Sequence, residues 1–155
     1  MQTRIIDFLN WRKTFKSEKD LIDQLNKYLD RRHNGHISYP FSVGGYNFIG
    51  SIDEQYAVSV VFGAGRKDSR NAVAYELYKM EELKDKGLIK GGMVIYLTNH
   101  ISEWEHNSVI ALERDYEYNG TSFHLKNQYE DQWREEISPR RRYALFFTPE
   151  ADLYI

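Results

Sequence analysis

The sequence of 155 residues contains no cysteine. A disulfide scaffold, a cysteine-ligated zinc site and a thiol nucleophile are therefore excluded. No apolar run approaches the roughly 18 residues that a membrane span requires, and the first twenty residues do not resemble a secretion signal. We therefore expect a cytoplasmic protein that makes no membrane contact, in a microbe or in the host of a mobile element.

Proline and net charge are also scarce. The chain has three prolines and a formal net charge of −2, and it shows no repeat or low-complexity linker. These features predict a single domain over residues 1–155, and they argue against a strongly basic nucleic-acid binder, although local basic patches are still allowed.

Aromatic residues, in contrast, are abundant at 15% of the chain. They mostly alternate with polar residues within strand-like runs, which favours core packing over a stacking surface for bases.

Helical periodicity of apolar residues occurs in three places. It predicts helices over residues 4–15, over residues 18–31 and from about residue 69 to residue 86. Ser17 has the right position to cap the second helix, and Gly87 has the right position to end the third.

Strand-like runs separate these helices and follow them. Three lie between the second and third helices, and an apolar run at 93–97 predicts a buried central strand. The order of helix, three strands, helix, strand and further β structure predicts a mixed α/β (α+β) fold with a mixed sheet. The other predicted strands are 36–43, 45–52, 56–62, 108–117, 121–126 and 142–148, with a turn at 119–120.

Residues 71–104, "NAVAYELYKMEELKDKGLIKGGMVIYLTNHISEW", combine an acid–base–acid helix with an apolar strand. This combination resembles the restriction-endonuclease-like, or PD-(D/E)XK, nuclease superfamily, in particular its small uncharacterised bacterial members. The resemblance covers the architecture of about residues 18–148 and implies a restriction-endonuclease-like core. The residues that carry it are Glu76, Lys79, Glu81, Leu97, Thr98, Asn99 and Trp104.

The resemblance also implies a catalytic motif: an Asp on one strand, then an acid and a lysine two residues apart on the next, which hold Mg²⁺ and activate water. In this chain the matching positions are Asn47, Ser59 and Val61. None of them can perform the expected role well, so the motif is degenerate and we expect a protein that is not an enzyme.

Relocated acids are the alternative. Asp53 lies in a predicted turn, and Glu76 and Lys79 share a helix face because they are three residues apart. If all three faced one cleft, Asp53 and Glu76 would be the metal ligands of an active Mg²⁺-dependent nuclease. The competing interpretation is a surface ion pair beside a polar turn.

Two basic clusters are candidates for phosphate contacts, provided that both flank one groove. The acidic segment 130–136 would neutralise part of them, and solvated flanks are the competing interpretation. The clusters are "RKDSR", with Arg66, Lys67 and Arg70, and "PRRRY", with Arg140, Arg141 and Arg142.

Three functions are therefore open. The first is a nuclease-fold protein that has lost its metal site and acts as a nucleic-acid-binding, regulatory or inhibitory module. The second is an active nuclease with relocated acids, and the third is a small protein-interaction factor of the immunity or antagonist type. We expect no cofactor, or Mg²⁺ only under the second; the expected partners are nucleic acid or a protein, and a homodimer is open.

Overall fold

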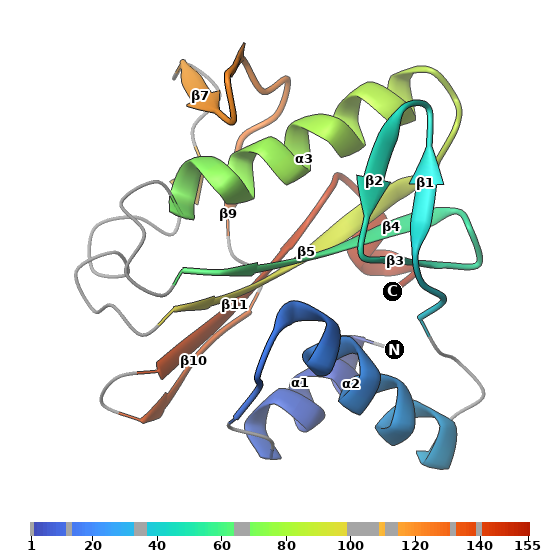
Figure 1. Cartoon of the computed structure of the whole chain (residues 1–155), viewed down its shortest axis with the longest axis vertical. Helices are drawn as coiled ribbons and strands as arrows, with labels where there is room; N and C mark the ends of the chain where they lie inside the picture. Colours follow the sequence, from blue (N-terminus) through green and yellow to red (C-terminus); the bar gives the residue numbers. More distant parts are fainter. Residues whose placement is uncertain are drawn as a thin grey trace.

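A five-stranded mixed sheet forms the centre of the protein, with helices on both faces (Figure 1). The structure is a computed structural model that describes residues 2–11, 14–32, 37–63, 69–98, 109–110, 115–130, 133–138 and 141–155. The strand order is β10-β11-β5-β4-β3. The strands are β3 (Gly50–Ile52), β4 (Tyr56–Phe62), β5 (Gly91–Thr98), β10 (Trp133–Ser138) and β11 (Arg141–Phe147).

One helical crossover organises this sheet. Strands β4 and β5 run parallel, and helix α3 (Ser69–Asp85) connects them, whereas the other neighbouring strands pair antiparallel. Strand β5 lies in the middle of the sheet and its residues 91–97 are buried, which confirms the buried central strand expected at 93–97. The mixed α/β class is therefore confirmed.

The two faces of the sheet carry separate cores. Helices α1 (Gln2–Trp11) and α2 (Glu18–Arg32) cover one face, and α3 covers the other (Figure 1). Because successive side chains of a strand point to opposite faces, β4 serves both cores. Val58 packs in the core with α1 and α2, and Val61 packs in the core with α3.

Local signals set the helix ends as expected. The main-chain N–H of Asp20 donates to Ser17 Oγ (3.1 Å), so Ser17 caps α2. Gly87, with φ +72°, follows α3, and the N–H of Leu88 donates to the carbonyl of Leu83 at 3.0 Å. Asn99 and Trp104, which belong to the resemblance, lie outside the described residues.

The expectation of three strands between the second and third helices is wrong. The predicted strand 45–52 is divided into β2 (Tyr46–Phe48) and β3, and β2 pairs with β1 (Phe41–Val43) in a separate hairpin. Gly44 and Gly45, with φ +57° and +84°, form the turn of that hairpin. The predicted strand 36–43 shortens to β1 because Pro40, which lacks an N–H, interrupts it.

The C-terminal third is a series of short strands. The expected turn is confirmed, since Asn119 and Gly120 both have positive φ between β7 (Tyr116–Tyr118) and β8 (Thr121–Phe123). Strand β10 and the short strand β9 (Tyr129–Glu130) were not predicted, whereas β6 (Val109–Ile110), which pairs with β9, lies within the predicted strand 108–117. The predicted strand 108–117 falls partly outside the described residues, and a 3₁₀ helix, η1 (Ala151–Leu153), lies near the end. In the described part of the chain, no helix has both the length and the apolar character needed to cross a membrane.

Candidate functional site

A buried polar cluster lies between β4 and α3, and it contains three of the predicted positions: Ser59, Glu76 and Lys79. The hydroxyl of Ser59 donates to Glu76 Oε1 at 2.6 Å. The ammonium of Lys79 lies 2.8 Å from Glu76 Oε2, across one turn of the helix. The two carboxylate oxygens of Glu76 therefore have different partners, one from the strand and one from the helix.

The hairpin β1–β2 covers this polar cluster. Lys79 Nζ donates to the main-chain carbonyl of Asn47 at 3.1 Å, and it lies 4.8 Å from the ring centroid of Phe48 and 5.2 Å from that of Tyr75. Ring faces at such distances attract a cation. Lys79 is only 7% exposed, so its charge is balanced by protein groups instead of water. The expected surface ion pair is therefore wrong, because the pair lies beneath the hairpin.

The side chains at the other two motif positions, Asn47 and Val61, are not part of the polar cluster. The side chain of Asn47 is exposed, and its Oδ1 accepts a hydrogen bond from Ser42 Oγ at 2.6 Å, so it contributes only its main-chain carbonyl. Val61 shares a strand face with Ser59, as the motif requires, but it is buried in the core beside α3.

Asp53 lies away from the polar cluster. It is an exposed residue with φ +54° in the turn that joins β3 to β4. Ser59 is three residues beyond the first residue of β4, which corresponds to about 10 Å along a strand. Of the relocated trio, the structure therefore brings together Glu76 and Lys79 but not Asp53.

Sequence reasoning missed Ser51. Strand β3, and not β2, pairs with β4, and Ser51 pairs with Ala57, whose side chain faces α3. Directly opposed residues of an antiparallel pair point to the same face, so Ser51 also faces α3. Ser51 is 1% exposed, and its hydroxyl makes no hydrogen bond within the described part of the chain. The strand next to β4 thus offers a hydroxyl at this face where the motif needs an acid.

These residues do not fit Mg²⁺. Glu76 is the only carboxylate of the polar cluster, and a lysine ammonium lies against it, whereas Mg²⁺ in proteins is bound through carboxylate and other oxygen ligands. Among the residues that the structure describes, no three His, Asp or Glu side chains are grouped so as to hold a metal ion.

Glu81, the other acid of the resemblance, has a different position and role. It is buried and accepts hydrogen bonds from the N–H groups of Lys126 (2.8 Å) and Asn127 (3.1 Å) and from the hydroxyl of Tyr129 (2.6 Å). Burial, followed by the bond to Glu81, raises the pKa of Tyr129 well above its ordinary value. Glu81 therefore anchors the segment after β8 to α3.

The described residues next to the two basic clusters lie at one end of the sheet. Phe62, the last residue of β4, pairs with Leu97, and Arg142, the second residue of β11, pairs with Thr98. We call the end defined by Phe62, Thr98 and Arg142 the basic end. Helix α3 follows β4 and begins at Ser69.

Only part of each basic cluster can be placed. Arg70 is half-buried near the start of α3, and Arg141 and Arg142 are placed by their backbone in β11. Arg66, Lys67 and Arg140 lie outside the described residues. Glu136 of β10 pairs directly with Arg142, so an acid of the segment 130–136 does lie beside the second cluster.

Comparisons of the chain with family models, with curated proteins and with solved structures found no match. The structure itself defines the class as mixed α/β, with a parallel β4–α3–β5 unit at its centre. The restriction-endonuclease-like core and the superfamily remain predictions from the sequence.

Proposed function

We propose that the chain has a restriction-endonuclease-like frame without the catalytic function, and that it binds nucleic acid at the basic end of the sheet. The observation that carries the loss of catalysis is the closed polar cluster, in which Glu76 and Lys79 are paired with each other and covered by the hairpin β1–β2.

The requirements of nuclease chemistry support the loss of catalysis. A metal-dependent nuclease must bring carboxylates, metal and water to a phosphodiester. Ser59 and Lys79 are 2% and 7% exposed and the side chain of Glu76 is 19% exposed, so the cluster offers a phosphate little access. The neighbouring face position of β3 is Ser51, which is not an acid.

The case for nucleic-acid binding rests on the register of the sheet. The basic clusters follow the end of β4 and lie at the start of β11, and these two strands flank β5, so they are two strand spacings, roughly 10 Å, apart. Cationic side chains that follow from strand ends at this spacing suit contacts with phosphates of one nucleic-acid strand. Because cationic side chains supply this attraction, we expect binding that weakens strongly as salt rises.

The test is fluorescence anisotropy with labelled single-stranded DNA, duplex DNA and RNA at low salt. The double variant Arg66→Ala with Arg140→Ala removes one charge from each cluster, and we expect it to weaken binding at least tenfold. The matched control is Lys27→Ala with Lys86→Ala, which removes two exposed lysines outside both clusters and should change affinity less than about twofold. Equal weakening in both double variants, or no binding at low salt, contradicts the proposal.

A cleavage assay with Mg²⁺ or Mn²⁺ tests the proposed loss of catalysis. We expect plasmid DNA, single-stranded DNA and RNA all to stay intact. Metal-dependent cleavage that falls in Glu76→Ala would contradict the loss of catalysis and would favour the relocated-acid nuclease. Absence of both cleavage and nucleic-acid binding would leave the protein-interaction factor.

A further inference from the structure

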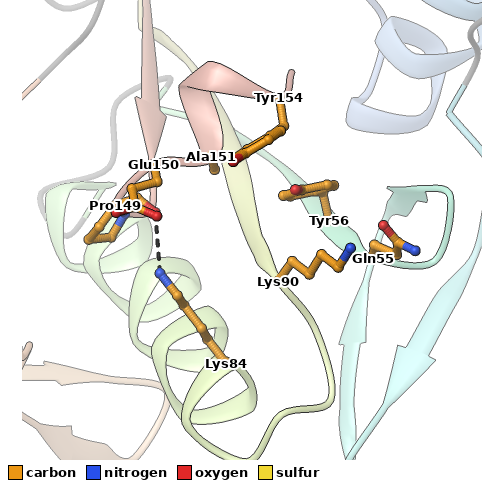
Figure 2. Close-up of a pocket in the computed structure, with 8 residues that line it drawn as sticks. All are labelled: Gln55, Tyr56, Lys84, Lys90, Pro149, Glu150, Ala151 and Tyr154. Carbon is orange, nitrogen blue, oxygen red and sulfur yellow. Dashed lines mark hydrogen bonds between the residues drawn. The ribbon is translucent and has the colours of Figure 1, made fainter.

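A pocket of about 420 Å³ opens near the other end of the sheet, where β4 and β5 begin (Figure 2). Tyr56, the first residue of β4, pairs with Gly91, the first residue of β5, whereas the basic end lies where these two strands finish. The volume falls within the roughly 300–1,000 Å³ of small-molecule sites. Its lining includes Gln55, Tyr56, Lys84, Lys90, Glu150 and Tyr154.

One wall of the pocket is an aromatic pair. The rings of Tyr56 and Tyr154 are stacked, with centroids 6.3 Å apart and planes at 20° (Figure 2). Tyr56 is buried, whereas Tyr154 is 69% exposed. Tyr154 therefore rests with one side on a buried ring and leaves much of its surface open, which is the arrangement of a stacking platform.

The backbone holds Tyr154 in this position. The N–H of Ala151 donates to the carbonyl of Thr148 at 3.0 Å, and the N–H of Tyr154 donates to the carbonyl of Ala151 at 3.1 Å. The next residue, Ile155, is buried in the core with α1 and α2. Because the main chain at Tyr154 is ordered before any ligand arrives, little backbone freedom is lost on binding.

Cationic groups border the same space. Lys84 of α3 donates to the carbonyl of Pro149 at 3.2 Å, and its ammonium keeps two further donors (Figure 2). Lys90 is exposed, and its main-chain N–H donates to the carbonyl of Gln55 at 2.7 Å, which fixes the start of the side chain. Among the described residues of the lining, Glu150 is the only acid beside two lysines, so this part of the lining carries a net positive charge.

We propose that this pocket binds a nucleoside monophosphate, with the base stacked on Tyr154 and the phosphate attracted by the positive charge of Lys90 and Lys84, whose side chains point to different sides of the pocket (Figure 2). A planar ring with a single anionic group matches a stacking platform beside two ammonium groups. Glu150 can accept hydrogen bonds from ribose hydroxyls, and it disfavours the additional charge of a triphosphate.

This inference does not depend on the proposed function, because the pocket and the basic end are built from different ends of β4 and β5. The test is an NMR titration of the full chain with adenosine monophosphate, adenosine and inorganic phosphate. We expect adenosine monophosphate to bind at least tenfold more tightly than either of the other two probes, since only it engages both the platform and the lysines.

Four variants locate the site. Tyr154→Ala should weaken binding of adenosine monophosphate about 5- to 150-fold, which corresponds to the roughly 1–3 kcal/mol typical for loss of a base-stacking ring. Tyr154→Phe, which keeps the ring, should stay within about twofold. Lys90→Ala should weaken binding about tenfold, and Lys86→Ala, an exposed lysine outside the lining, should not change it.

Three results would overturn the inference. They are the absence of any spectral change with adenosine monophosphate at millimolar concentration, inorganic phosphate binding as tightly as adenosine monophosphate, and Tyr154→Ala binding as well as the unmodified chain. Tyr154→Phe and Lys90→Ala alter only exposed side chains, so the NMR spectra of both variants should show the native fold. A change in their affinity then reports on the pocket and not on unfolding.

Discussion

Replacement of Lys79 by Met tests whether the polar cluster is an internal, closed unit. The substitution removes the ion pair with Glu76, the hydrogen bond to the carbonyl of Asn47 and the contacts with two aromatic rings. Breaking a fully buried ion pair costs about 3–5 kcal/mol, because one charge remains without its partner. Glu76 keeps 19% exposure of its side chain and can recover some hydration, so we expect a loss of about 2–4 kcal/mol in the free energy of unfolding.

Urea denaturation followed by circular dichroism measures this loss, within a double-mutant cycle. Glu76→Gln alone should cost less than Lys79→Met, and the double variant should cost less than the two single changes together, with a coupling of at least about 1 kcal/mol. The control Lys86→Met, on an exposed lysine, should change stability by less than about 0.5 kcal/mol. A loss below about 0.5 kcal/mol for Lys79→Met, or a coupling near zero, would refute the closed cluster and indicate an ordinary surface pair.

Two further predictions follow from the hairpin and from the anchored segment. Gly44→Ala places a Cβ 2.5 Å from Leu83 Cδ2 at φ +57°, whereas the Cβ of Gly120→Ala, at φ +76°, meets no atom within 4 Å. Thermal melts should show a loss in the free energy of unfolding of about 2–4 kcal/mol for Gly44→Ala and about 1 kcal/mol for Gly120→Ala. Equal losses would contradict the packing of the hairpin on α3. The raised pKa of Tyr129 means that the folded state holds this proton more tightly than the unfolded state, so its contribution to stability is complete below pH 10 and falls as pH rises above it. Melts between pH 9 and 11.5 should decline less steeply in Tyr129→Phe, and identical slopes would argue against the burial of this phenol beside Glu81.

The features that the sequence predicted well are those that depend on neighbours along the chain. Ser17 caps α2, Gly87 follows the end of α3, and Asn119–Gly120 forms a hairpin turn, because each depends on backbone preferences within a few residues. The buried stripe of α3 and the apolar β5 were likewise readable from periodicity.

The features that the sequence did not reveal depend on contacts between distant segments. The strand pattern over 45–52 is continuous, and only its two different partners, β1 and β4, divide it. For the same reason, the i,i+3 relation of Glu76 and Lys79 was readable, but the cover over them was not. Strand β10 was not predicted, because the three consecutive charged residues at 134–136 interrupt the alternation of apolar and polar residues that indicates a strand.

The two outer strands of the sheet have a consequence for how this chain meets copies of itself. An unpaired strand edge can recruit another chain, and proteins limit this by charge, by bulges and by short strands. Here β10 carries Arg134, Glu135 and Glu136 and has an irregular register between Glu136 and Ser138, while β3 is three residues long and its Ser51 already bridges Ser38. Extension of the sheet from one molecule to the next is thus disfavoured at both margins, which protects the fold from fibre-like association.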